Sequence, residues 1–246
     1  MIDICMVVHG NYCLAEWQVE HWRRFPRARL LLADNTRGDK MPIPNADVTV
    51  VDQVLTGDGR SHGYALDLLA RKSNSPIIGT ADTDFFWLIP DIVERVEAEF
   101  AAGKACVGCQ GWYEDWHLVD ARWPGRAGHL APVCWGMFVR RDLALSETFV
   151  VTPEEGQAIM ETGWRLRDRL IREGHQMTVL KPFKMSLPWI TDHMLRTAAE
   201  GSWFFGPSEQ EPWGVHYLKG SGSRAALVRG LKQIVDHFVN RWGKGV

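Results

Sequence analysis

The sequence lacks any apolar run long enough to cross a bilayer and carries almost no net charge. Its 28 Lys and Arg residues are balanced by 30 Asp and Glu residues, which gives a formal net charge of -2. Because nucleic-acid-binding proteins normally carry a broad basic field, this balance argues against that class of partner. The first apolar stretch contains Asp3 and has no charged segment before it, unlike a secretory signal. We therefore expect a cytoplasmic protein.

Cysteine is also scarce, and the sequence has no internal repeat or low-complexity tract. The five cysteines are odd in number and scattered, so a disulfide scaffold is not expected. Cys106 and Cys109 form a Cys-x-x-Cys pair, but the residues around them predict a strand, in which positions three apart point to opposite faces. With no second pair, we expect buried thiols here and not a zinc or redox site.

The first hundred residues alternate between predicted strands and predicted helices. At 246 residues, with 46% hydrophobic and 24% charged residues, the chain fits one large α/β domain. Such alternation predicts a parallel sheet with right-handed crossovers. The strands are expected at residues 2–8, 28–33, 48–51 and 76–81. The helices are expected after the turn at 9–10, carrying Leu14, Trp17, Val19 and Trp22, at about 61–72, and after Pro90 up to Gly103.

The second half has a more mixed pattern. Strands are expected at 105–108, 117–120, 133–139 and 177–180, and helices at 153–173 and 192–199. A loop is expected to lead to Trp213, and a final helix to begin at Arg224. No convincing linker divides the chain, so we expect one domain over residues 1–246.

Two acids follow the apolar strand at 76–81. Asp82 and Asp84 are separated by one residue, where the strand is expected to leave the sheet. In parallel α/β sheets, ligands bind beyond the carboxyl ends of the strands. Two carboxylates at such a place offer the hard oxygen ligands that suit a divalent cation holding phosphates. A solvated turn is the alternative interpretation.

Taken in order, these features resemble a glycosyltransferase of the GT-A fold. They are the β-α-β beginning, the acid Asp34 after the second strand, the Asp-x-Asp after the fourth strand, and a late His216 followed by the loop 217–224. The resemblance covers nearly the whole chain. It implies an α/β, GT-A-like fold with a mainly parallel central sheet, flanking helices and a mixed acceptor-side half. Residues 1–103 would form the nucleotide-sugar-binding half, and residues 104–246 the acceptor-binding half with the C-terminal helix.

The resemblance also implies an activity and a cofactor. A hexosyltransferase of this kind moves a sugar from a nucleotide-diphosphate donor to a hydroxyl acceptor, which is a glycan, a lipid-linked sugar or a small molecule. Asp82, Asp84 and His216 would hold Mn²⁺ or Mg²⁺, with Asp84 as a ligand and Asp82 contacting the metal or the donor. The cation stabilises the departing diphosphate. Carboxylates with one imidazole suit these ions better than a structural zinc.

Several polar residues are predicted to bind the donor. Asp34 would lie near the base or ribose. The glycine-rich stretch 57–63 precedes a helix whose N-terminus could favour a diphosphate, although a flexible loop capped by Ser61 is an equal alternative. The loop 219–224 offers cations, small residues and free amides for phosphate oxygens, or is simply a surface loop. The predicted donor-binding set is His9, Asp34, Arg60, Asp82, Lys219, Ser221 and Arg224.

A base must accept the proton of the attacking hydroxyl group. Asp192, in the segment 191–196, resembles the acidic helix motif of inverting GT-A enzymes and is the predicted base. The alternative is a helix cap formed by Thr191 with Asp192 in the first turn. In that case Glu114 or Asp115 is the alternative base, and a retaining outcome stays open. The sequence predicts no oligomeric state.

Tryptophan is abundant, with 12 residues, and some of these side chains could stack on sugar. Those in polar or Gly- and Pro-containing stretches are Trp112, Trp116, Trp123, Trp135, Trp189 and Trp213. The last helix is amphipathic, with Leu231, Phe238 and other apolar residues on one side. It is expected to dock onto its own domain, and peripheral contact with the inner membrane face is the alternative.

Two other functions and one other fold are alternatives to this interpretation. A sugar-phosphate nucleotidyltransferase should carry a Gly-rich, cationic loop directly after its first strand, but residues 9–14 contain no Lys or Arg. A Rossmann dinucleotide-binding fold is disfavoured by the absence of closely spaced glycines in the same segment. A non-catalytic carbohydrate-binding domain would use the aromatic surface without the metal.

Overall fold

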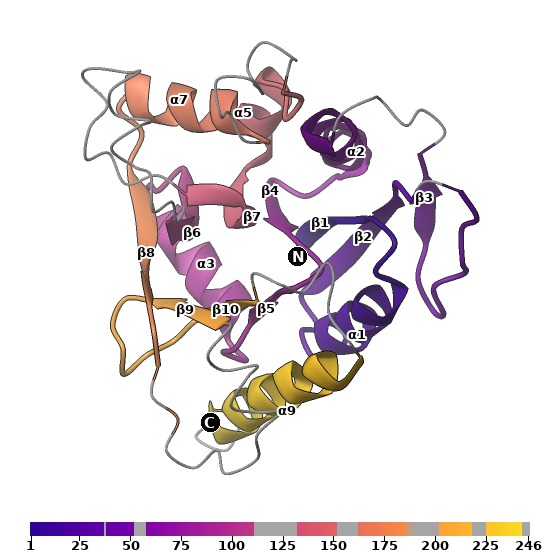
Figure 1. The fold of residues 1–246 in the computed structure, drawn as a ribbon. Helices are drawn as coiled ribbons and strands as arrows, with labels where there is room; N and C mark the ends of the chain where they lie inside the picture. The colour runs from indigo at the N-terminus through magenta and orange to yellow at the C-terminus, as the bar shows by residue number, and fades with distance from the viewer. Residues whose placement is uncertain are drawn as a thin grey trace, which may run out of the picture.

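A single mixed sheet forms the centre of the molecule (Figure 1). The computed structural model describes residues 1–36, 38–51, 58–110, 132–151, 162–185, 187, 202–217 and 225–242, with only the backbone for 58–61, 225–229 and 242. Within these residues ten strands are joined in the order β3-β2-β1-β4-β7-β6-β8-β9-β10-β5. Helices flank this sheet, as expected for an α/β fold.

The first half of the sheet is parallel, as the sequence predicts. Strand β1 (Ile2–Val8) lies between β2 and β4 and is parallel to both, and β3 extends the sheet beyond β2. The carboxyl ends of these four strands therefore lie along one edge. The other elements of this half are β2 (Ala28–Asp34), β3 (Val48–Val50), β4 (Ile77–Ala81), α1 (Tyr12–Trp22), α2 (Asp58–Lys72) and α3 (Ile92–Ala101).

The second half is mixed. Strand β7 (Pro132–Arg140) is antiparallel to both β4 and β6 (Cys106–Gln110), whereas β8 (Met177–Phe183) is parallel to β6. Three short strands complete the sheet by antiparallel pairing: β9 (Ser202–Gly206), β10 (Gly214–Tyr217) and β5 (Phe85–Trp87). The remaining helices are α5 (Arg141–Ser146), α7 (Trp164–Arg172) and α9 (Ala225–Trp242).

Two sequence predictions about the second half need correction. The helix expected at 153–173 is not continuous: α7 begins at Trp164, directly after Gly163, whose backbone is left-handed with φ of 76°, and residues 153–161 lie outside the described residues. The expected loop before Trp213 contains strand β9. The strand expected at 117–120 and the helix expected at 192–199 lie outside the described residues.

Neighbouring residues of the short strands alternate between two apolar cores. Phe85 and Phe205 belong to the core that includes buried residues of α1 and α3, whereas Phe86, Phe204 and Val215 face the core under α9. The same alternation separates the two cysteines of β6, with Cys109 in the first core and Cys106 in the core beside α2. The prediction of two buried thiols on opposite faces is therefore confirmed.

Helix α9 docks onto its own domain through the apolar side that the sequence predicts. Its residues Leu231, Ile234, Val235 and Phe238 are buried against β5, β9 and β10. Polar contacts tie the same helix to α1 and to the residues just after it: Lys232 pairs with Glu20 at 3.0 Å, and Arg24 pairs with Asp236 at 2.7 Å. Figure 1 shows the two helices side by side. Among the described helices, none has the length and apolarity that a membrane span requires.

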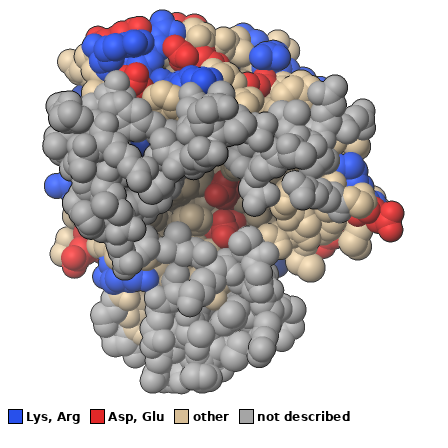
Figure 2. Space-filling view, turned by 45° about the horizontal axis from the view of Figure 1, so that its top comes forward, with Lys and Arg blue, Asp and Glu red and all other residues tan. Residues whose placement is uncertain are grey.

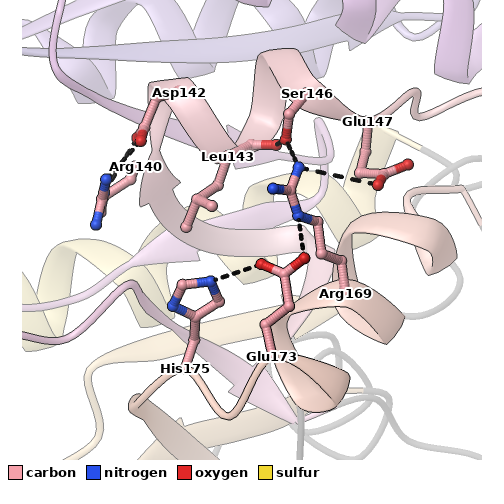
Figure 3. A network of polar contacts seen from close by, with 8 residues as sticks. All are labelled: Arg140, Asp142, Leu143, Ser146, Glu147, Arg169, Glu173 and His175. Carbon is pink, nitrogen blue, oxygen red and sulfur yellow. Dashed lines mark hydrogen bonds and ion pairs between the residues drawn. The ribbon is translucent and has the colours of Figure 1, made fainter.

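A polar network connects α5 and α7 (Figure 3). Arg169 donates to Glu173 at 2.9 Å and also contacts Ser146 and Glu147. Glu173 lies 3.2 Å from the His175 ring, which follows the helix. This network joins α7 to the carboxyl end of α5 and does not include any residue predicted for the site.

Candidate metal centre

The segment Asp82–Asp84 forms a tight turn between β4 and β5. Asp82 donates its backbone N–H to the carbonyl of Trp135 at 3.1 Å, and Phe85 donates to the carbonyl of Asp82 at 3.1 Å. Gln18, fully buried on α1, donates to the carbonyls of Thr83 at 3.0 Å and Phe85 at 2.7 Å. The backbone that carries the two acids is thus held from three elements.

Strand β10 brings His216 to the same turn. It pairs with β5 so that His216 lies opposite Phe85, and the N–H of Tyr217 donates to the carbonyl of Asp84 at 3.1 Å. The His216 Nε2 atom lies 3.2 Å from Asp84 Oδ1, and one ligand atom from each of Asp82, Asp84 and His216 lies within 4.8 Å of the others. Figure 2 shows acidic atoms inside a hollow on this side of the molecule.

The electrostatics of the three side chains fit a cation. Burial and the nearby charge of Asp84 raise the pKa of Asp82, although His62 and His216 oppose this effect. Burial by itself would lower the pKa of His216, but the hydrogen bond to Asp84 and the charges of both acids raise it. Because two carboxylates this close repel each other, a divalent cation between them would be stabilising. Oxygen ligands with one imidazole nitrogen suit Mn²⁺ or Mg²⁺.

His62 is a site residue that the sequence analysis missed. Its Nε2 atom lies 3.7 Å from Asp82 Oδ1, and the side chain is half-buried. It belongs to the first turns of α2, within the glycine-rich stretch from which we selected Arg60. The side chain of Arg60 lies outside the described residues. The signal for His62 was its place near a helix N-terminus, but nothing in the sequence indicates that α2 approaches Asp82.

Asp34 lies at the carboxyl end of β2, as predicted, but its carboxylate is already used within the chain. Asp34 accepts from the Tyr12 hydroxyl at 2.9 Å and from the Thr36 N–H at 2.9 Å. Lys40 donates to the carbonyls of Asp34 at 2.9 Å and Thr36 at 3.1 Å. The acid therefore shapes the loop after β2. His9, the last predicted donor residue of this edge, is exposed after β1.

Asn35 is a second residue that the sequence analysis missed. It is 1% exposed, and neither its Oδ1 nor its Nδ2 has a hydrogen-bond partner in the part of the chain that the structure describes. A buried amide with neither group paired is unusual, because its desolvation costs about 1–3 kcal/mol. It lies next to Asp34, at the same sheet edge as Asp82.

The six tryptophans considered for sugar contact have different outcomes. Trp135 is half-buried beside the turn, and its ring stacks on His216 with centroids 4.5 Å apart. Trp213 is buried, donates to Glu211 at 3.2 Å and packs in the core, so it is not a sugar platform. The other four, Trp112, Trp116, Trp123 and Trp189, lie outside the described residues.

The remaining predicted site residues fall in segments that the structure does not describe. They are the base Asp192, its alternatives Glu114 and Asp115, and the phosphate-loop residues Lys219, Ser221 and Arg224. Their roles stay predictions. The described part of the site therefore comprises Asp82, Asp84 and His216, with His62 and Trp135 in contact with them.

Solved structures share this fold. A mycobacterial protein is 15% identical to this chain and has a TM-score of 0.54. The aligned region covers 91% of this chain and 89% of that protein. Glucosyl-3-phosphoglycerate synthase from Mycobacterium tuberculosis, in complex with Mn²⁺, UDP and phosphoglyceric acid, matches 74% of this chain and 68% of its own, at 16% identity and a TM-score of 0.52.

A weaker match is the mannosyltransferase PcManGT from Pyrobaculum calidifontis, in complex with GDP-Man and Mn²⁺. It has 14% identity and a TM-score of 0.49. The aligned region covers 80% of this chain but only 60% of that protein. No protein-family model and no curated protein match the sequence. The structural matches above a TM-score of 0.5 show that the chain has a GT-A-like fold, as the sequence resemblance implies.

Proposed function

We propose that this chain is a metal-dependent glycosyltransferase, which moves a sugar from a nucleotide-diphosphate donor to a hydroxyl acceptor. The observation that carries the proposal is the grouping of Asp82, Asp84 and His216 within 4.8 Å at the carboxyl edge of the parallel strands. Asp84 and His216 are 132 positions apart in the sequence, and the pairing of β10 with β5 brings them together.

The structural neighbours support the same activity. Glucosyl-3-phosphoglycerate synthase, which shares the fold, has been solved with Mn²⁺ and UDP, and also with Mn²⁺ and UDP-glucose at a TM-score of 0.51. Identities of 15–16% establish a common fold but not a common substrate. The activity of this chain therefore rests on its own acids and histidine, for which the neighbours supply a precedent of cofactor and donor class.

The described residues have distinct roles in this reaction. A bound Mn²⁺ or Mg²⁺ supplies Lewis-acid stabilisation of the departing diphosphate. Asp84 and His216 would hold the cation, and Asp82 would contact the cation or the donor ribose. His62, which lies beside Asp82, would donate a hydrogen bond to a phosphate oxygen. Gln18 keeps the turn that carries the acids in place.

The nucleotide base is assigned to the carboxyl end of β2. In this interpretation the loop after β2, which Asp34 orders, receives the base. Strands β2, β1 and β4 are neighbours, so this end lies about 10 Å from the acids of β4. That separation suits a nucleotide whose diphosphate reaches the metal centre.

The acceptor side of the proposal rests on the sequence. Asp192 remains the proposed base, and Lys219, Ser221 and Arg224 remain the proposed phosphate-binding loop that follows His216. The donor would lie mainly on residues 1–103 and the acceptor on residues 104–246, in line with the division that the sequence resemblance implies.

A thermal-shift screen of nucleotide diphosphates and nucleotide sugars, with and without Mn²⁺, tests the donor class. Selective binding raises the melting temperature by mass action. The protein should respond to one nucleotide type only when Mn²⁺ is present, and should slowly hydrolyse the matching nucleotide sugar. Asp84→Asn should lose both responses while keeping the fold.

The matched control is Asp236→Asn, which removes an acid of α9 whose partner is the exposed Arg24, away from the site. It should leave both responses intact. Metal-independent binding or hydrolysis that survives in Asp84→Asn would refute the proposal. A nucleotide that binds in Mn²⁺ without any hydrolysis or transfer in an acceptor screen would favour a non-catalytic domain.

A further inference from the structure

Trp135 on β7 stacks on the histidine of the metal centre. We propose that Trp135 is a positioning residue, which holds the imidazole plane of His216 in the orientation that binds the cation. This inference deepens the proposed function and rests on it, because it concerns the same Mn²⁺ or Mg²⁺ site.

The first reason is the hydrogen bonding of the His216 ring. Its Nε2 atom faces Asp84 at 3.2 Å, which marks Nε2 as the metal-binding nitrogen. Its Nδ1 atom is buried and has no hydrogen-bond partner among the described residues. Histidines that bind metals usually fix their ring by donating from the second nitrogen to a carboxylate or carbonyl. Here that anchor is not found within the described chain, so another contact must set the ring plane.

The second reason is the geometry of the stack. The Trp135 and His216 rings are 4.5 Å apart between centroids and 23° from parallel. Phe85 also contacts His216, but with centroids 6.2 Å apart and planes 55° apart. Trp135 therefore presents the flat surface against which the imidazole lies. Rotation of the imidazole out of its plane would drive it into the indole.

The third reason is that the indole is itself fixed. Phe205 meets Trp135 edge-on at 5.1 Å and 62°, and Phe85 packs against it at 5.8 Å. Phe85 lies tightly between two glycines, since a Cβ at Gly136 or Gly214 would be 2.9 or 2.6 Å from its ring. The Trp135 carbonyl also accepts from the Asp82 N–H. One residue thus contacts the backbone of the first acid and the ring of the histidine.

The expected effect follows from what a stacked pair contributes. Loss of the stacked pair should weaken the affinity about 2- to 10-fold. This is at or below the lower limit of the effect, about 10- to 100-fold, that follows removal of groups that hydrogen-bond to metal ligands. Trp135→Phe keeps a flat ring and should bind Mn²⁺ close to wild-type affinity. Trp135→Leu fills much of the space without a planar surface and should bind Mn²⁺ about 2- to 10-fold more weakly.

The experiment is a titration of Mn²⁺ followed by electron paramagnetic resonance of the free ion. It uses the full chain as wild type, Trp135→Phe, Trp135→Leu, His216→Ala and the double variant His216→Ala/Trp135→Leu. If Trp135 acts through His216, its loss should weaken binding in the wild-type background but not in the His216→Ala background. Thermal melting of each variant reports any general loss of the fold.

The outcomes separate the two proposals. Wild-type protein that binds no Mn²⁺, alone or with nucleotide diphosphates, would overturn both the proposed function and this inference. Wild-type binding with an unchanged affinity in Trp135→Leu would overturn the inference only. Equal weakening by Trp135→Leu with and without His216 would also overturn it, because the indole would then act through the general structure. Failure of Trp135→Phe to restore affinity would have the same meaning.

Discussion

Replacing Gln18 with leucine should destabilise the protein and loosen the turn that carries Asp82 and Asp84. Gln18 is fully buried on α1, and its Nε2 atom donates to the carbonyls of Thr83 at 3.0 Å and Phe85 at 2.7 Å. Leucine has similar bulk but donates nothing. The substitution therefore removes both hydrogen bonds without creating a large cavity.

The magnitude follows from the two carbonyls that lose a donor. Leaving a buried acceptor unpaired costs about 1–3 kcal/mol, so two of them would cost about 2–6 kcal/mol. The Gln18 Oε1 atom has no partner in the described chain, and removing it gives back part of that cost. A net loss of about 2–4 kcal/mol is expected, which lowers the melting temperature of a chain of this size by about 5–15 °C.

Urea unfolding gives the free-energy difference, and calorimetric titration of Mn²⁺ gives the effect on the site. The matched control is Gln176→Leu, at an exposed glutamine whose side chain accepts from Lys104 at 3.3 Å. That control should change stability by less than about 0.5 kcal/mol. A Gln18→Leu protein as stable as the wild type, with unchanged Mn²⁺ affinity, would refute the reasoning that α1 supports the turn.

Three further predictions concern the core, the site and the loop after β2. The pKa of the buried Asp3 is lowered, because its hydrogen bonds to Arg29 and Ser73 outweigh the effect of burial. Asp3 therefore stabilises the folded protein fully above its unfolded pKa of about 4, and this stabilisation is lost as the pH falls below it. The free energy of unfolding, measured from about pH 6 to 3, should exceed that of Asp3→Asn by an amount that shrinks with acid. A constant difference between the two proteins would contradict this assignment. Gly214→Ala should destabilise by about 1–3 kcal/mol, since its Cβ would lie 2.6 Å from the Phe85 ring; thermal melting tests this, and an unchanged midpoint would show that Phe85 moves freely. Asn35→Leu should leave the protein equally or more stable, because it removes an unpaired buried amide; a clear loss of stability in denaturant would contradict this reasoning.

The parallel half of the fold could be predicted from the sequence because its signals are local. Apolar runs such as residues 2–8 and 77–81 mark buried strands, and the helix ending near Gly103 has a clear apolar side. The antiparallel strands β5, β9 and β10 were not predicted. Each is three to five residues long, and β5 is joined to β10 from a distant part of the sequence. Short strands of this kind carry too little periodicity to distinguish them from loops.

The site was predictable to the extent that its residues share a motif. Asp82 and Asp84 are adjacent to a recognisable strand, and His216 was selected through the family resemblance. His62 was not selected, and Trp135 was selected only as a candidate for sugar stacking, because their contacts at the site come from across the sheet. His62 reaches Asp82 from α2, and Trp135 reaches His216 from β7. The reverse holds for Asp34, whose position was predicted correctly while its bonds to Tyr12 and Thr36 were not visible in the sequence.

A crystal structure of the protein soaked with Mn²⁺ and a nucleotide diphosphate, with anomalous scattering collected near the manganese edge, tests the central claim most directly. We predict one strong anomalous peak coordinated by Asp84 and His216, with a phosphate oxygen of the nucleotide on its open side. A nucleotide bound elsewhere, or a manganese peak away from Asp82, Asp84 and His216, would contradict the account.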